Sequence, residues 1–301
     1  MPSSAQLSRR GLLLGGSAAG LAGCMAPGPD GVADFTHLNI PVQTDIAYGD
    51  HPMQRLDVYP AAQSRRGNTL PRRPAVVFFH GGFWQFGDRS EAPVQTICSH
   101  LAARGITAIG AGYRLYPDAH YQGILEDAAR AVAWATQNGE RFGAAPGRVV
   151  ASGHSAGGWM SAMLHVRPQL VQQALGTAES GRHPLCGIVG VAGPYAHWPT
   201  RFPLLFSMFE GVPTEQRLPN TYVSGNLPPS LLVQGLLDTI VWPPNAFFFA
   251  RDLRHAGNRS TVRPYLREHM TVMPVVGLLP GSLALVDDIE AFVKSPEVSA
   301  A

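Results

Sequence analysis

Continuous runs of apolar, often β-branched residues recur along most of this chain, and longer amphipathic segments separate them. A strand without polar alternation is buried on both faces, as strands are in a parallel sheet covered by helices. We therefore predict an α/β fold with a mostly parallel central sheet and helices on both sides. The predicted strands span residues 54–59, 75–79, 106–111, 148–152, 187–191, 230–234 and 261–266, of which 54–59 alternates like an antiparallel strand. The predicted helices span residues 92–104, 121–138, 156–170, 244–256 and 284–294.

Composition narrows the class of function. Of the 301 residues, 45% are hydrophobic and 15% are charged, which suffices for a folded core. The 23 basic and 21 acidic residues give a net charge of +2 without a basic tract, whereas nucleic acid binding requires a strongly positive face. The three cysteines lack the spacing of a zinc site or a disulfide framework. These features argue against a nucleic-acid partner and favour chemistry on a small molecule.

One short motif lies where a predicted strand passes into a predicted helix. Residues 153–158 read Gly-His-Ser-Ala-Gly-Gly and follow the apolar strand at 148–152. In a G-x-S-x-G sequence of this setting, the flanking glycines allow the chain to turn sharply, and the turn holds the serine above the sheet. We therefore predict that Ser155 is a catalytic nucleophile.

A second glycine motif, which includes Gly81, Gly82 and Phe83, follows the buried strand at 75–79. An acyl-transfer nucleophile needs N–H donors aimed at the oxyanion that develops in the transition state, and a glycine-rich loop at the end of such a strand supplies them. The predicted oxyanion hole consists of the N–H groups of Gly82, of Gly81 or Phe83, and of Ala156 after the nucleophile.

The remaining catalytic groups are expected in the chain order serine, acid, histidine. Asp238 follows the predicted strand at 230–234, and no carboxylate follows the preceding strand until Glu210, so Asp238 is the predicted acid. His269 follows the next strand and precedes the last helix, which makes it the predicted base. His255 also comes after Asp238, but it falls in the last turn of a predicted helix, where it complements the helix dipole.

The other side chains with reactive groups are interpreted as structural. His80 is expected to hold the oxyanion loop by hydrogen bonds rather than to transfer protons. The remaining histidines considered are taken as structural or surface groups: His154, His165, His183 and His197. Cys98 and Cys186 are expected to be buried thiols rather than a disulfide.

Residues 193–229 are irregular and rich in proline and aromatic residues, and we interpret them as a lid-like insertion over the site. Its larger side chains either line a substrate pocket or complete the core, and the sequence leaves both readings open. They are His197, Trp198, Phe202, Phe206, Met208 and Phe209.

The first 23 residues have the features of an export signal. Arg9 and Arg10 precede an uncharged run that is too short to span a bilayer, and this pattern resembles a twin-arginine signal peptide. Residues 21–24 resemble the bacterial lipobox, which implies that Cys24 becomes the lipidated first residue of the mature chain. The lipid bilayer is then a partner of a periplasmic lipoprotein. Met25, in place of an aspartate after the cysteine, favours anchoring in the outer membrane over the inner membrane. Residues 24–43 would form the lipidated tether.

Several segments together resemble the α/β-hydrolase superfamily, in particular the branch of carboxylesterases and arylformamidases with an H-G-G-x-W motif. They are HGGFWQ at 80–85, GYRLYPD at 112–118, DAARAV at 127–132, GHSAGG at 153–158, and the segments around Asp238 and His269. The resemblance implies an α/β-hydrolase domain at 44–296 that uses a serine nucleophile without a metal or an organic cofactor.

Three functions remain open at this point. The first is a serine esterase that acts on small to medium acyl esters, and the second is an amidase or aryl formamidase that uses the same triad. The third is a binding module that keeps the scaffold without catalysis. No feature of the sequence specifies an oligomeric state.

Overall fold

The computed structural model describes residue 38 and residues 40–62, 71–177, 181–199, 207–274 and 283–300. The predicted export signal and Cys24 lie outside these residues, as do Phe202 and Phe206 of the insertion. In the part of the chain that is described, eight strands form one sheet. In the order in which they lie side by side, they are β1 (Gln43–Ala47), β2 (Arg55–Tyr59), β4 (Ala108–Ala111), β3 (Ala75–Phe79), β5 (Val149–His154), β6 (Gly187–Val191), β7 (Ser230–Gly235) and β8 (Ser260–Tyr265).

The sheet is mostly parallel. β2 pairs antiparallel with both β1 and β4, whereas every pair from β4 to β8 is parallel. All five residues of β3 are buried, as the continuous apolar run predicts. The predicted α/β fold is therefore confirmed, and β2 is the antiparallel strand expected at residues 54–59.

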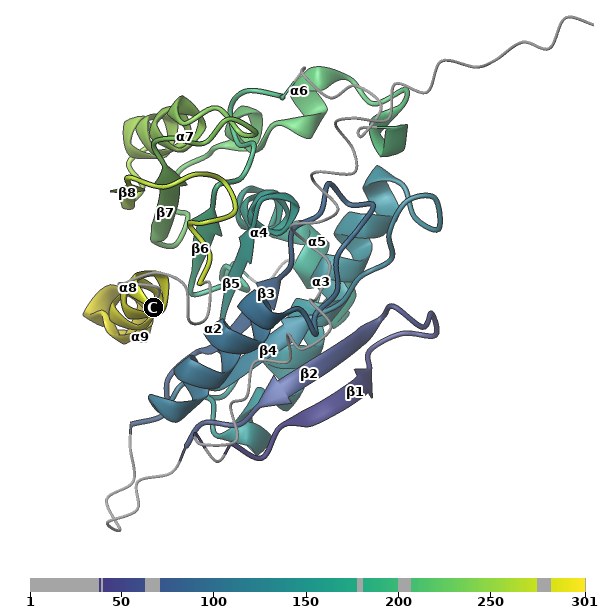
Figure 1. The fold of residues 1–301 in the computed structure, drawn as a ribbon, viewed down its shortest axis with the longest axis vertical. Helices are drawn as coiled ribbons and strands as arrows, with labels where there is room; N and C mark the ends of the chain where they lie inside the picture. Colours follow the sequence, from purple (N-terminus) through teal and green to yellow (C-terminus); the bar gives the residue numbers. More distant parts are fainter. Residues whose placement is uncertain are drawn as a thin grey trace, which may run out of the picture. The chain divides into compact units, whose positions relative to one another are not determined.

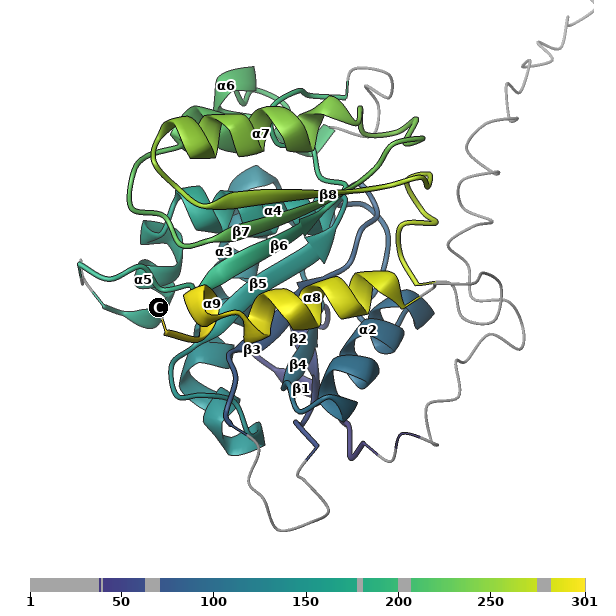
Figure 2. The same cartoon turned by 90° about the vertical axis from the view of Figure 1, so that its left-hand side faces the viewer.

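Helices cover both faces of this sheet (Figures 1 and 2). The longer helices are α2 (Ala92–Ala103), α3 (Tyr121–Asn138), α4 (Ala156–Val166), α5 (Gln169–Leu175), α7 (Pro244–His255) and α8 (Ala284–Lys294), followed by the short α9 (Pro296–Ala300). Alternate residues of β3 show which helices cover which face, because Val76 and Phe78 pack toward α2, α8 and α9, while Val77 and Phe79 pack toward α3, α4, α5 and α7.

One predicted helix is interrupted. The sequence predicts a single helix over residues 156–170, but α4 ends at Val166 and α5 begins at Gln169. Pro168 explains the break, because proline lacks an N–H group and disfavours the helical conformation in the residue before it. Arg167 accordingly leaves the helical region, with φ −129° and ψ 64°.

Two further regions, the first strand and the insertion, complete the comparison with the predicted elements. β1 was not predicted, because it is an edge strand whose residues are exposed apart from a half-buried Ile46, so it carries no core-facing pattern. Where it is described, the insertion contains short helical turns, among them α6 (Thr214–Arg217) and η4 (Pro219–Tyr222). Among the described residues, no helix combines the length and the apolar character that a bilayer crossing requires.

Parallel pairing determines where the functional side chains meet. β3, β5, β7 and β8 all end at the same edge of the sheet, so the loops that follow them lie together. Ligands bind at the carboxyl ends of the strands in sheets of this type. The four predicted motifs are placed on these loops.

Candidate active site

Ser155 lies at a strained turn between β5 and α4. Its backbone has φ +52° and ψ −112°, a conformation that residues with a side chain rarely adopt. The turn packs so closely that a Cβ on Gly157 would lie 2.1 Å from the carbonyl oxygen of Phe79. The strain is therefore located at the serine itself, and Gly157 is required by the close approach of the backbone.

Ser155, His269 and Asp238 form a continuous hydrogen-bonded chain. The Oγ of Ser155 lies 2.9 Å from Nε2 of His269, and Nδ1 of His269 lies 2.7 Å from Oδ2 of Asp238. All three residues are buried, with exposed fractions of 6%, 4% and 5%. The structure thus brings together the three residues that the chain order singled out.

The loops that carry Asp238 and His269 are tied to each other. β7 and β8 are neighbouring parallel strands, and Leu237 N–H donates a hydrogen bond of 3.0 Å to the carbonyl of Arg267 just beyond them. Asp238 follows β7 and His269 follows β8, so this bond fixes the distance between acid and base. The same edge of the sheet therefore sets the geometry of both residues.

The carboxylate of Asp238 is held by several donors. Oδ1 accepts hydrogen bonds from the N–H groups of Ile240 at 2.9 Å and Val241 at 2.8 Å, and Oδ2 accepts one from Nε2 of Gln234 at 3.1 Å. Since an ionised carboxylate only accepts hydrogen bonds, His269 donates its Nδ1–H to Asp238. Its Nε2 is then the acceptor that faces Ser155.

A fourth side chain, His154, lies against the base. Its Nε2–H donates to the carbonyl oxygen of His269 at 2.9 Å, and the two rings are 4.7 Å apart. Burial, with a smaller contribution from the neighbouring His269, lowers the pKa of His154 to about 3, so the ring is neutral at pH 7. The sequence interpretation of His154 as structural missed this contact. Its position next to Ser155 was the available signal.

The predicted oxyanion loop lies beside the nucleophile. Gly82, Phe83 and Trp84 have φ of +114°, +54° and +60°, a conformation that glycine adopts freely but that strains the backbone at Phe83 and Trp84. A Cβ on Gly81 would lie 3.4 Å from Cβ of Ser155, which places this glycine in contact with the nucleophile turn. Gly82 is required for a separate reason, because a Cβ there would lie 2.2 Å from the carbonyl oxygen of Phe86.

Ala156 completes the predicted set of donors. It is the first residue of α4, and the first N–H groups of a helix have no partner within that helix. The N-terminus of a helix also carries a partial positive charge. The N–H of Ala156, one residue after the nucleophile, is therefore suited to bind a developing oxyanion.

His80 holds the base of the oxyanion loop. Its ring is buried, donates a hydrogen bond from Nδ1 to the carbonyl of Gly81 at 2.7 Å, and stacks on Tyr113 at 4.3 Å. Burial lowers the pKa of His80 to about 4, so it is uncharged at neutral pH. These contacts agree with a role in holding the loop.

Comparison with known proteins identifies the architecture. Residues 76–186 match the family model described as the alpha/beta hydrolase fold. A solved structure of Thermogutta terrifontis esterase 2, phosphonylated by sarin, has a TM-score of 0.68 and 24% identity, and the match covers 84% of this chain and 95% of that chain. The chain has the α/β-hydrolase fold. A truncated carbohydrate esterase from gut microbiota has a similar α/β-hydrolase structure, with a TM-score of 0.67 at 17% identity over 91% and 99% of the two chains.

Curated relatives of this α/β-hydrolase chain carry esterase names. Esterase LipC of Mycobacterium tuberculosis is 29% identical over 72% of this chain and 56% of its own length. The carboxylic ester hydrolase LipN of the same organism is 34% identical over 46% of this chain and 33% of its own length. The chain thus spans about half or less of the length of these relatives.

Aromatic side chains fill the interior of the hydrolase domain beside the oxyanion loop. Trp84 from this loop meets Trp159 at 5.1 Å and Phe209 at 4.9 Å between ring centroids, and all three are buried. Trp159 lies one turn after the nucleophile, since its N–H donates to the carbonyl of Ser155 at 3.0 Å. The half-buried Trp198 stacks on Trp84 at 5.8 Å. Trp198 and Phe209 of the insertion thus belong to the core and also adjoin the site.

No metal site accompanies these groups in the described ranges. Nowhere in them do three or more His, Cys, Asp or Glu side chains gather as metal ligands would. Cys98 and Cys186 are both buried free thiols.

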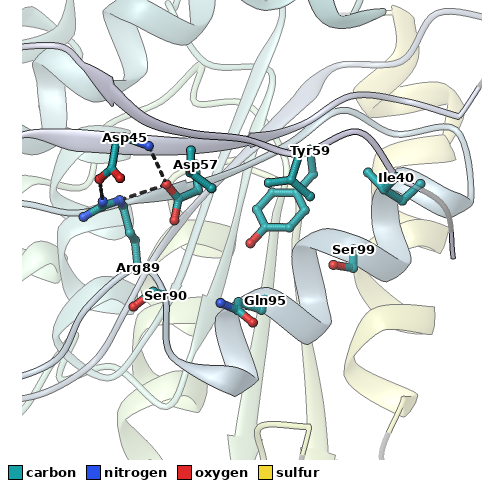
Figure 3. Close-up of a pocket in the computed structure, with 10 residues that line it drawn as sticks. Ile40, Asp45, Asp57, Tyr59, Arg89, Ser90, Gln95 and Ser99 are labelled. Carbon is teal, nitrogen blue, oxygen red and sulfur yellow. Dashed lines mark hydrogen bonds and ion pairs between the residues drawn. The ribbon is translucent and has the colours of Figure 1, made fainter. Parts of the chain in front are cut away.

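A pocket of about 550 Å³ lies elsewhere on the fold, between the first two strands and α2 (Figure 3). Asp45 and Asp57 both point toward Arg89, which binds both carboxylates, with Nε 3.1 Å from Oδ1 of Asp57, and the backbone N–H of Asp45 donates to the same Oδ1 at 3.0 Å. The described residues that line this pocket do not include Ser155, Asp238 or His269. Its charges pair with one another instead of facing a nucleophile.

Proposed function

We propose that this protein is a serine hydrolase that cleaves carboxylic esters through an acyl-enzyme intermediate. The observation that carries the proposal is the hydrogen-bonded chain from Ser155 through His269 to Asp238, which begins at a strained serine. The relatives named as esterases and the solved esterase of the same fold support the same reaction.

In the first step, Nε2 of His269 accepts the proton of Ser155 as Oγ attacks the carbonyl carbon of the ester. Asp238, which is hydrogen-bonded to Nδ1, stabilises the imidazolium that forms and keeps the ring in the productive orientation. His154 holds the backbone of His269 from the other side and, being neutral, adds no repulsion to the imidazolium.

The attack also produces an oxyanion that the enzyme must stabilise. The N–H groups of Ala156 and of the loop at Gly82 and Phe83 donate to the tetrahedral oxygen, and one such donor contributes roughly 3 kcal/mol to the transition state. His269 then gives its proton to the leaving alcohol. In the second half of the reaction, a water molecule loses a proton to His269 and attacks the acyl carbon, and His269 returns this proton to Oγ of Ser155 as the carboxylic acid leaves.

The acyl group is proposed to be small to medium in size. Trp84 and Trp159 are fully buried side by side next to the oxyanion loop and the nucleophile, and Phe209 packs against both. These rigid side chains leave less room for a long chain on this side of Ser155.

The protein is also proposed to be exported by the twin-arginine route and anchored in the periplasm through a lipid on Cys24. The support is the order of Arg9, Arg10, the uncharged segment and the cysteine in the first 24 residues. Metabolic labelling with a palmitate analogue tests the anchor. Labelling of the native chain and its loss in Cys24→Ala are expected, and equal labelling of both would refute the anchor.

A substrate panel tests the activity. We expect hydrolysis of p-nitrophenyl acetate and butyrate, slower hydrolysis of the dodecanoate, and no turnover of any of them by Ser155→Ala. Formyl and acetyl anilides are measured beside the esters. Faster cleavage of the anilides would identify an amidase or formamidase, and absence of all turnover in a folded protein would contradict the proposal.

A further inference from the structure

Exposed apolar side chains are concentrated at the edge of the sheet that carries the candidate active site. The described residues include seven large apolar side chains that are substantially exposed: Val42, Phe86, Leu236, Leu237, Trp242, Phe247 and Leu266. Four of them lie on the loops that carry the acid and the base, and Phe86 lies on the loop after β3. Scattered single exposures are ordinary in soluble proteins, but a cluster marks an interaction surface.

We use the name apolar rim for Leu236, Leu237, Trp242 and Leu266. Leu266 is 76% exposed, and the other three are about half exposed, at 46%, 50% and 53%. Large aliphatic side chains and a tryptophan presented this way remain in contact with water unless a partner covers them.

The backbone places the leucines of the apolar rim side by side. Leu236 N–H donates to the carbonyl of Tyr265 at 2.7 Å, and Leu237 N–H donates to that of Arg267 at 3.0 Å. Leu266 lies between these two acceptors in the chain, so the three leucines lie on two loops that are hydrogen-bonded to each other.

Trp242 belongs to the same structural unit. The carboxylate of Asp238 accepts the N–H groups of Ile240 and Val241, which folds the segment between Leu237 and Trp242 into a tight turn. The rim is therefore built on the same hydrogen bonds that hold the acid, and it cannot move away from the site independently of Asp238.

We propose that the apolar rim docks on a lipid bilayer surface and that the physiological substrate is an ester presented at that surface. This inference rests on the proposed function, because it names the class of substrate for the Ser155 site. Leucine is favoured in the acyl region of a bilayer and tryptophan at its interface, so the composition of the rim matches a lipid surface.

The tether keeps the rim within reach of a membrane. If Cys24 carries a lipid, 16 residues lead from it to Ile40, where the continuous described part of the chain begins, and a chain of this length spans at most about 56 Å. The anchor would keep the rim at a high effective concentration near the bilayer, as the first of two linked binding sites does for the second. The rim then needs only a weak affinity for lipid.

Two arginines on the elements that flank the rim take part in ion pairs, which favours apolar over electrostatic docking. Arg263 of β8 lies 3.3 Å from Asp288, and Arg251 of α7 lies 2.7 Å from Asp252. We therefore expect binding to neutral lipid, with a minor effect of anionic lipid.

Vesicle sedimentation tests the docking surface. The full chain with Cys24→Ser, which cannot be lipidated, is mixed with phosphatidylcholine vesicles with or without phosphatidylglycerol. The added triple change Leu236→Ser, Trp242→Ser and Leu266→Ser is expected to lower the partition coefficient at least tenfold. Val42→Ser is the matched control, because Val42 is exposed beside β1 on the opposite part of the sheet, and it is expected to bind as the parent does.

Quenching of intrinsic fluorescence provides a second readout with a more conservative variant. Trp242→Phe keeps an apolar ring but removes an indole that is 53% exposed. We expect phosphatidylcholine with brominated acyl chains to quench the parent strongly and Trp242→Phe weakly, while both sediment with vesicles. Equal quenching would show that Trp242 does not enter the lipid and would overturn the proposal.

Activity separates this inference from the proposed function. Two rates are measured for each protein, one on a butyrate ester carried in vesicles and one on dissolved p-nitrophenyl butyrate. Both rates are normalised to the fraction of protein that a fluorophosphonate labels. We expect the ratio of the vesicle rate to the solution rate to fall at least tenfold in the triple variant. Lack of labelling and hydrolysis in the parent would refute the proposed function. The docking would be refuted if a labelled, active parent did not bind vesicles, or if the triple variant kept the same ratio. It would also be refuted if sedimentation velocity showed that the rim only mediates dimers.

Discussion

Two buried aspartates, Asp238 and Asp127, have fully covered side chains, yet they support different structures. Asp127 in α3 binds Arg114 through two side-chain bonds of 2.7 and 2.9 Å and a backbone N–H at 2.9 Å, and it also accepts Nε2 of Gln54 at 2.7 Å. Asp238 instead binds His269, which in turn binds Ser155.

The difference lies in the partner rather than in burial. The hydrogen bonds to Asp127 raise the pKa of Arg114, so this guanidinium holds its protons and the pair acts as a fixed clamp. Asp238 binds an imidazole whose other ring nitrogen faces the hydroxyl group of Ser155 on a strained turn, so its chain of hydrogen bonds ends at a group that can react. The same buried carboxylate thus stabilises the fold in one place and supports chemistry in the other.

The largest expected effect is on the catalytic side of this comparison. Asp238→Asn should lower kcat for p-nitrophenyl acetate about 10⁴-fold, because the amide no longer stabilises the imidazolium or selects the tautomer of His269. His269→Ala should have a similar effect. Steady-state kinetics on protein of verified thermal stability measure it. Near-native turnover in either variant would show that the residue is not part of the triad.

The same substitution in the clamp between Asp127 and Arg114 should lower stability and leave turnover nearly unchanged. Asp127→Asn leaves Arg114 without its counter-charge, and we expect the free energy of unfolding in urea to fall by about 3 kcal/mol. Turnover per folded molecule should stay within roughly twofold of the native value. A 100-fold loss of kcat without loss of stability would place the clamp in the catalytic machinery.

Substitution of a glycine in the oxyanion loop should lower kcat by an intermediate amount. In Gly82→Ala, the new Cβ would overlap the carbonyl oxygen of Phe86, so the loop must shift, and kcat should fall about 100-fold. Gly176→Ala is the control, because Gly176 also has a positive φ, of +67°, but no atom lies within 4 Å of the new Cβ. The control should lose about 1 kcal/mol of stability and no activity. Equal kcat values in the two variants would contradict the role of the loop.

The smallest predicted effect concerns a buried histidine outside the site. Within the described residues, neither ring nitrogen of His165 has a hydrogen-bond partner, and burial holds its pKa well below the usual value. The unfolded chain therefore binds more protons below pH 6.5, so folding stability falls as the pH falls. His165→Leu should remove this contribution and gain up to about 2 kcal/mol relative to the native chain on going from pH 7.5 to 5. Urea unfolding at the two pH values measures it, and parallel losses would contradict the assignment.

Regular elements were visible in the sequence because local patterns define them. The apolar runs at 75–79 and 187–191 and the helical patterns at 121–138 and 284–294 have the bounds found in the structure. The exposed β1 and the break at Pro168 were missed, since the first has no apolar face and the second is a single residue within a helical pattern.

In the site, chain order was enough to select Ser155, Asp238 and His269 from many candidates. What it could not show are contacts between segments that are distant in the chain. The clamp joins Gln54 to Asp127, and the bond from His154 reaches the loop of His269. Residues 112–118 and 127–132 were recognised by resemblance alone, and only the structure shows that Arg114 and Asp127 bind each other.

The central claim is that Ser155 is activated by the chain through His269 to Asp238, and that burial of a carboxylate alone does not provide this. The most direct measurement is the rate at which a fluorophosphonate modifies Ser155, mapped by peptide mass spectrometry, in the native chain, Asp238→Asn and Asp127→Asn. We predict modification at Ser155, a rate lower by orders of magnitude in Asp238→Asn, and a native rate per folded molecule in Asp127→Asn. Absence of modification at Ser155 in the native chain, or equal rates in the native chain and Asp238→Asn, would contradict the account.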